Sequence, residues 1–95
     1  MPKYVIERVI PGIGTWSAEQ LKAVSRTSCD VLNELGLSIE WLQTYVTADK
    51  LYSIYNSPNE ALIREHAKRT GFPANSIAEV RTIIGPFIVN QTDTS

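Results

Sequence analysis

The chain has 95 residues, a formal net charge of −1 at pH 7, one cysteine and one histidine. This charge argues against a nucleic-acid-binding surface, because such domains are usually basic, and no apolar run approaches the ~20 residues that span a bilayer. The lone Cys29 cannot form an internal disulfide, which fits a reducing compartment. We therefore expect a cytoplasmic protein with neither a nucleic-acid nor a membrane partner.

The first two predicted elements are a strand and a helix. Residues 3–10 are rich in Tyr, Val and Ile and stop at Pro11-Gly12, a pattern typical of a strand. Ser17 and Gln20 then form a capping box. Apolar residues follow at helical spacing, and Gly36 supplies a left-handed stop.

A hairpin is predicted next. Residues 37–47 alternate, so that one side of this strand carries Ile39, Trp41, Gln43 and Tyr45. A turn at Ala48-Asp49 leads to a partner strand over residues 51–56.

A second helix and a last strand complete the pattern. Ser57 is the expected N-cap, with Pro58 at the first helical position and Glu60 closing a capping box. The helix is expected to end at Gly71, and residues 76–84 to form a strand closed by Gly85-Pro86.

This order of elements predicts an α+β, ferredoxin-like βαββαβ fold. Its four-stranded antiparallel sheet has both helices on one face, and the first and third strands at the centre. Residues 1–86 would form the single domain, and residues 87–95 a polar C-terminal tail.

The other face of the sheet is expected to be open. In the last strand the small apolar row, which we expect to face the helices, is Ala78, Val80, Thr82 and Ile84. The opposite, open row is then Ile77, Glu79, Arg81 and Ile83, with further residues Trp41, Gln43, Tyr45, Tyr4, Ile6 and Arg8 from the other strands. Such a mixture of aromatic residues, Ile and Arg resembles an interface. It favours a homodimer with two sheets stacked face to face over the alternative, a half-solvated antiparallel sheet.

The first strand carries an ionisable residue that needs a partner whichever way it faces. With Ile6 and Arg8 on the open face, Glu7 lies under the helices, where an unpaired carboxylate is costly. With the strand turned over, Arg8 takes that position.

The candidate site is centred on His66, which lies on or beside the apolar side of the second helix. Facing the sheet, it would meet Glu7 as a carboxylate–imidazole pair able to act as a general base, a proton shuttle or part of a metal site. Tyr45 and Tyr52 are candidates to line the same pocket. The alternative is a structural histidine whose ring bonds locally near a helix C-terminus.

The stretches YVIERVIPG, YVTADKLYSIYNSP and IREHAKRTGFPANSI resemble a small bacterial family of nickel-responsive-like proteins, over about residues 3–86. The resemblance implies a ferredoxin-like dimeric α+β barrel and a divalent metal, nickel or a similar ion, with His66 as a ligand. Two features of the sequence argue against a metal site. Histidine, the ligand that nickel favours, occurs once. Arg8 on the first strand stays protonated and cannot ligate a cation.

Three functions remain open at this point. The first is a dimeric module that binds a divalent metal or a small ligand near His66, helped by Glu7. The second is a cofactor-independent enzyme of the dimeric α+β barrel type, an oxygenase or isomerase, with Glu7 and His66 as its acid–base pair. The third is a non-catalytic oligomerisation module.

Overall fold

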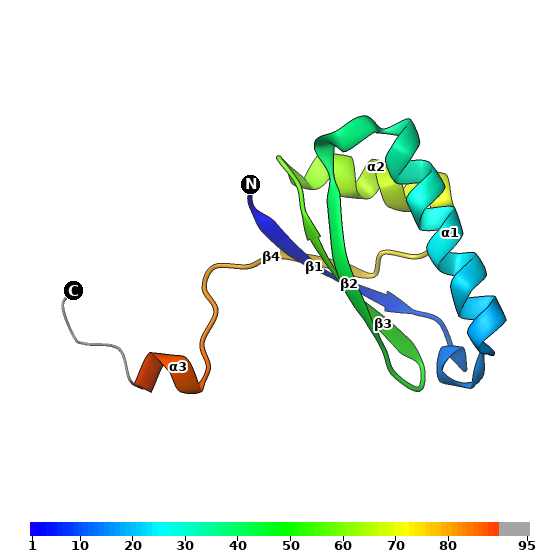
Figure 1. Cartoon of the computed structure of the whole chain (residues 1–95), viewed down its shortest axis with the longest axis horizontal. Helices are drawn as coiled ribbons and strands as arrows, with labels where there is room; N and C mark the ends of the chain where they lie inside the picture. The colour runs from blue at the N-terminus through cyan, green and yellow to red at the C-terminus, as the bar shows by residue number, and fades with distance from the viewer. Residues whose placement is uncertain (90–95) are drawn as a thin grey trace.

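The computed structural model describes residues 1–89, which form one four-stranded antiparallel sheet with two helices packed on one face (Figure 1). The strand order is β2-β3-β1-β4, so the first and third strands are central. The strands are β1 (Lys3–Val9), β2 (Glu40–Val46), β3 (Lys50–Asn56) and β4 (Ser76–Glu79). The helices on the sheet are α1 (Ala18–Glu34) and α2 (Glu60–Thr70). This confirms the predicted ferredoxin-like α+β fold.

Helix α1 begins and ends where its sequence predicts. The Ser17 hydroxyl accepts from the Gln20 backbone N–H, and the Gln20 side chain accepts from the Ser17 N–H, so the capping box is complete. Past the C-terminal end of the helix, Gly36 adopts a positive φ of 77° and opens the short 3-10 turn η2 (Gly36–Ser38). A similar turn, η1 (Ile13–Thr15), joins β1 to α1.

Helix α2 begins two residues later than expected. Its N-cap is Asn59, whose side-chain oxygen accepts from the Leu62 N–H at 3.0 Å. Ser57, the predicted cap, is instead fully buried, and its hydroxyl donates to the Asn59 carbonyl at 2.7 Å. The predicted end at Gly71 is confirmed by its left-handed conformation, with φ of 78°.

Strand β1 turns Tyr4, Ile6 and Arg8 toward the helices, the reverse of the orientation preferred from the sequence. Tyr4 and Ile6 join a buried cluster with Ile63 of α2, because the layer between sheet and helix needs large apolar side chains. Glu7 consequently lies on the open face, and Arg8 takes the buried position that the sequence offered as the alternative.

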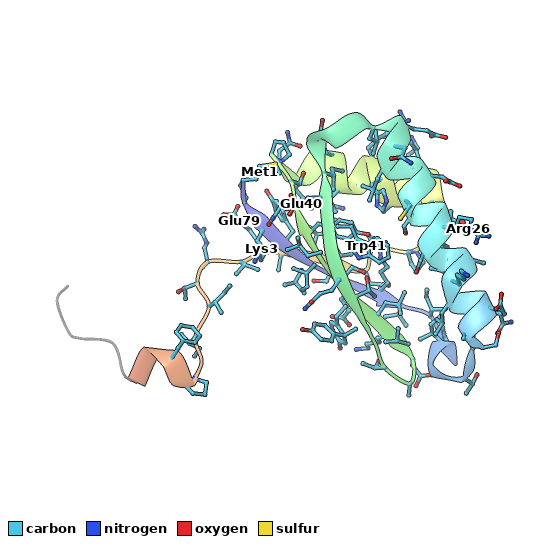
Figure 2. All side chains as sticks on the ribbon, in the orientation of Figure 1. Met1, Lys3, Arg26, Glu40, Trp41 and Glu79 are labelled. Atoms are coloured by element: carbon cyan, nitrogen blue, oxygen red, sulfur yellow. The ribbon has the colours of Figure 1, made fainter. Side chains whose placement is uncertain are left out.

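A β-bulge in β2 changes which residues face the helices. Trp41 pairs with Tyr55 of β3, whereas the next pair is Gln43 with Ile54, so Leu42 is the extra residue. Trp41 therefore lies on the helix side, between the sheet and α1 (Figure 2), and not on the open face as strict alternation predicts. Beyond the bulge, Gln43 and Tyr45 do lie on the open face.

Strand β4 is shorter than expected and faces the other way. It ends at Glu79, and the bond from the Val80 N–H to the Lys3 carbonyl is the last to β1, because β1 itself starts at Lys3. Ile77 pairs with Ile6 and packs against the core, so the row of Ile77 and Glu79 faces the helices and Ala78 does not.

The chain after β4 leaves the body of the molecule (Figure 1). It carries exposed Ile83, Ile84 and Phe87 and ends in a short helix, α3 (Pro86–Val89), where the polar tail was expected to begin. Residues 90–95 of that predicted tail lie outside the described residues. No helix in the described part of the chain is long and apolar enough to cross a bilayer.

Candidate functional site: a cavity between α1 and the sheet

His66 is buried where α2 meets both α1 and the sheet. Its side chain is 1% exposed, its ring centroid lies 5.4 Å from that of Tyr55 on β3, and its Nε2 lies 3.3 Å from the Ser28 carbonyl of α1. A carbonyl only accepts, so Nε2 carries the proton in this contact. The ring of His66, on α2, thus contacts both α1 and β3.

This environment disfavours the charged imidazolium. Burial lowers the pKa of His66, the hydrogen bond to the Ser28 carbonyl opposes this in part, and the positive charge of Arg8 adds a smaller lowering effect. His66 is therefore neutral at neutral pH, and the proton on Nε2 is engaged by α1.

Glu7 lies on the opposite face of the sheet from His66. Its carboxylate contacts the Lys50 ammonium at 2.9 Å, and this contact raises the pKa of Lys50. The structure does not bring Glu7 and His66 together, because the alternation of β1 puts Glu7 on the face away from α2. The acid–base pair considered from the sequence is absent from this arrangement.

Tyr45 and Tyr52 share the open face with Glu7. Glu7 pairs with Tyr52, and Tyr52 with Tyr45, so the three residues form one row across β1, β3 and β2. Tyr45 is 57% exposed. Three of the four candidate ligand-binding residues thus lie together on the open face, and His66 alone lies on the helix side.

The helix side contains a cavity of about 130 Å³ between α1 and the sheet. Its polar wall is formed by Arg8, Ser25, Ser28, Thr44, Ser53 and Tyr55. Its apolar wall is formed by Leu21, Val24, Trp41, Val46, Leu51 and Phe72. Val46 is exposed, so the rim of the cavity at the end of β2 reaches the surface.

Arg8 is the charged residue of this cavity. Its side chain is 2% exposed, and its Nη1 donates to the Pro73 carbonyl at 2.9 Å. The left-handed turn at Gly71 leads the chain over Arg8, which places both Pro73 and the cavity residue Phe72. Among residues 1–89, no carboxylate lies within ion-pair distance of this guanidinium.

The remaining polar wall is ordered by hydrogen bonds that depend on the bulge in β2. The Trp41 indole N–H donates to the Thr44 hydroxyl at 2.9 Å, and the Thr44 and Ser53 hydroxyls lie 2.9 Å apart. Trp41 and Thr44 share a face only because Leu42 is inserted between them. Burial raises the pKa of the Tyr55 phenol, although the charge of Arg8 acts in the opposite sense, so Tyr55 is a neutral member of the wall.

The described residues do not fit a divalent metal at His66. The Nε2–H donates to α1, which leaves Nδ1 as the one ring atom able to bind a metal, and the adjacent Arg8 charge repels a cation. Across residues 1–89, no three His, Cys, Asp or Glu side chains come close enough to hold a metal ion. The one cysteine, Cys29, is exposed on α1.

The sequence singled out His66 but missed most of the cavity. Strict alternation predicts Trp41 on the open face, because a bulge leaves no mark on an alternating pattern. Arg8 is also predicted on the open face, with a buried position as the alternative, and no cavity is predicted around it. The usable signal was the row of Leu51, Ser53 and Tyr55 in β3, whose period of two predicts a shared face.

Comparison with known proteins gives one family. A family model described as nickel responsive protein, SCO4226-like, matches residues 4–80. A solved structure, the crystal structure of SCO4226 from Streptomyces coelicolor A3(2), is similar with a TM-score of 0.72. The similarity covers 86% of this chain and 99% of that chain at 15% sequence identity, so this likeness shows the fold alone. No curated protein matches the chain.

Proposed function

This chain belongs to the SCO4226-like family of nickel responsive proteins, and from that premise we propose that it is a homodimeric protein that binds a small organic ligand near His66. The ligand site is the cavity between α1 and the sheet. The observation that carries the proposal is the cavity itself, about 130 Å³ with a lining of both polar and apolar side chains. Ligand sites in proteins commonly combine a mostly apolar lining with a few placed polar groups.

The size of the cavity limits the ligand to a few heavy atoms. An apolar cavity of ~150 Å³ in another protein holds benzene, and this one is slightly smaller. His66 lies behind the site, where its ring packs on Tyr55, a residue of the cavity wall. We therefore assign His66 the role of a structural residue that supports the wall.

The homodimer part of the proposal is supported by the open face of the sheet. Tyr45 is largely exposed there, in the same row as Tyr52, and uncovered aromatic residues of this kind are typical of interfaces. In a face-to-face dimer, Glu7, Tyr45 and Tyr52 would lie between the two sheets. They remain candidates for contacts to a ligand held there. The lone Cys29 supports a cytoplasmic location.

Neither a metal nor an enzymatic function is favoured by a specific observation. Nickel is suggested by the family name alone, whereas among the described residues no group of three or more His, Cys, Asp or Glu side chains could hold a metal ion. The enzyme alternative required Glu7 and His66 to act on one substrate, and the sheet separates them.

The two tryptophans allow a direct test, because Trp41 lines the cavity and Trp16 does not. Their indole N–H signals are followed by ¹H–¹⁵N NMR while benzene, propanol, propionamide and propionate are titrated in separate experiments. We expect at least one of them to shift the Trp41 signal in a saturable way and leave the Trp16 signal unchanged. If none of the four moves the Trp41 signal, the proposed ligand site is wrong.

A pair of variants on α1 supplies the control. Val24 lines the cavity, so Val24→Phe fills it and is expected to abolish the shift of the Trp41 signal. Ala23 is exposed on the same helix outside the lining, so Ala23→Phe is expected to leave binding unchanged. Equal loss in both variants would attribute the effect to α1 as a whole and count against the cavity.

A further inference from the structure

The buried guanidinium of Arg8 has consequences for the chemical class of the ligand. Taking a charge out of water is costly unless it is paired and hydrogen-bonded. Arg8 is 2% exposed, yet the groups of the described chain that it meets on the helix side include a carbonyl, a phenol and a neutral imidazole and no anion. Among residues 1–89 the carboxylates form their ion pairs elsewhere, with Lys50, Arg64 and Arg69.

The guanidinium of Arg8 has more N–H donors than its contacts with the Pro73 carbonyl and the Tyr55 phenol require. A guanidinium has five N–H donors in a planar fork, and the Pro73 carbonyl engages Nη1. Arg8 is bonded to the Pro73 carbonyl and is also one of the residues that line the cavity. Planar, two-pronged recognition by arginine suits a carboxylate.

The charge and the apolar residues of the cavity lining indicate which kind of anion fits. Arg8 supplies the single positive charge of the lining, which balances one negative charge and not two. Leu21, Val24 and Phe72 are among the apolar residues of the same lining, which offers a surface for a short hydrocarbon chain. A monoanion with an aliphatic part matches both features better than a phosphate does.

We propose that the cavity between α1 and the sheet binds a small aliphatic monocarboxylate, whose carboxylate accepts hydrogen bonds from Arg8 and whose chain lies on the apolar wall. This inference rests on the proposed function and names the ligand class of the same site. It assigns to Arg8 the role of the specificity-determining residue. The hydroxyls of Ser25 and Ser28 on α1 are within the same lining and are the further polar groups available to the ligand.

The test compares propionate with propionamide, which has the same shape without the charge, and with inorganic phosphate. Binding is followed by the Trp41 indole signal and by the Arg8 Nε–H signal, assigned with the Arg8→Lys variant. Because hydrogen bonds to charged groups are the stronger ones, we expect propionate to bind about tenfold or more tighter than propionamide. Phosphate is expected to bind more weakly than propionate.

Three other results would contradict the inference, and they differ in how much of it they overturn. Equal affinity for propionate and propionamide would overturn the carboxylate inference and leave the small-ligand site intact. Phosphate binding as tightly as propionate would overturn the choice of a monocarboxylate. If neither propionate nor propionamide moved the Trp41 signal and benzene and propanol also failed, the proposed function would fall with the inference.

Variants at Arg8 separate its charge from its hydrogen-bonding fork. Arg8→Met removes the charge at similar length and is expected to abolish the preference for propionate over propionamide. Arg8→Lys keeps a positive charge without the planar fork. We expect this variant to bind propionate more weakly than the wild type does, but still more tightly than it binds propionamide. A full preference in both variants would overturn the role of Arg8, and the wild-type comparison stands even if one variant fails to fold.

Discussion

At the scale of single residues, β1 places two neighbouring charged side chains, Glu7 and Arg8, on opposite faces of the sheet. Glu7 contacts Lys50 on the open face, where both side chains are partly exposed, and an ion pair of that kind contributes little to stability. Arg8, its neighbour in β1, points the other way and is buried. One residue of register in a strand therefore decides which charge borders the cavity.

His66 makes the stability of the protein depend on pH. Burial lowers its pKa below the ordinary value of 6.5 in the folded state. In the unfolded chain the imidazole takes up a proton as the pH falls through 6.5, whereas the folded protein resists protonation. The stabilising contribution is therefore complete above 6.5 and is lost as the pH falls from there toward the lowered pKa.

We expect the free energy of unfolding, measured in urea at pH 7.5, 6.5 and 5.5, to fall more steeply for the wild type than for His66→Gln. The difference in slope is at most about 1.4 kcal/mol per pH unit, the value for one proton. An NMR titration of the imidazole, the chain's single histidine, gives the pKa directly. Parallel pH profiles, or a measured pKa at or above 6.5, would contradict this account of His66.

At the scale of elements, the two main helices differ in how well their start is predicted. Helix α1 offers one cap, Ser17, and the box with Gln20 forms as expected. The segment before α2 offers two good capping residues, Ser57 and Asn59. Burial decides between them: Ser57 is held in the interior, with its hydroxyl bonded to the Asn59 carbonyl.

The N-cap of α2 can be tested by substituting Asn59. Asn59→Ala leaves the Leu62 N–H without its side-chain acceptor and is expected to lower the free energy of unfolding by about 1 kcal/mol. Asn59→Asp is the matched control, because aspartate caps equally well. Urea unfolding checks both variants. If Asn59→Ala were as stable as the wild type, Asn59 would not be the functional cap.

The bulge in β2 is the element-scale feature with the largest effect on the site. It brings Trp41 and Thr44 to the same side of the sheet and joins them by a hydrogen bond. Without the insertion of Leu42, Trp41 would lie on the open face and the cavity would lose this residue from its lining. The alternating sequence of this strand is compatible with either arrangement, and the packing against α1 favours the bulge.

At the scale of the whole molecule, two apolar surfaces are uncovered in a single chain. One is the open face of the sheet around Tyr45, and the other is the segment after β4, with Ile84 73% exposed. Helices α1 and α2 both cover the opposite face (Figure 1). A thin core of this kind is commonly supplemented by self-association, which is why the homodimer is part of the proposed function.

We expect light scattering coupled to gel filtration to give twice the mass of one chain at micromolar concentration. In a symmetric face-to-face dimer each substitution occurs twice across the same interface. Tyr45→Lys on the open face is therefore expected to shift the protein toward the monomer. Ala23→Lys on the exposed side of α1 adds the same charge elsewhere and is expected to leave the mass unchanged. A wild-type mass of one chain would contradict the dimer.

The order of elements, the central strands, the cap of α1 and the end of α2 follow from the sequence by itself. Each depends on local chemistry, such as the Ser17–Gln20 box, the left-handed glycines Gly36 and Gly71, and the alternation of apolar residues. These signals lie within a few residues of the feature that they specify.

Only the tertiary structure decided which side of each strand faces the helices and where the cavity lies. The faces of β1 and β4 depend on the layer shared with α2, and the bulge in β2 depends on packing against α1. Such choices are settled by contacts between residues far apart in the chain. Arg8 and Pro73, 65 residues apart, form such a contact. The sequence identified His66 as the residue to explain, and the tertiary structure places its ring against Tyr55, which lines the same cavity as Arg8.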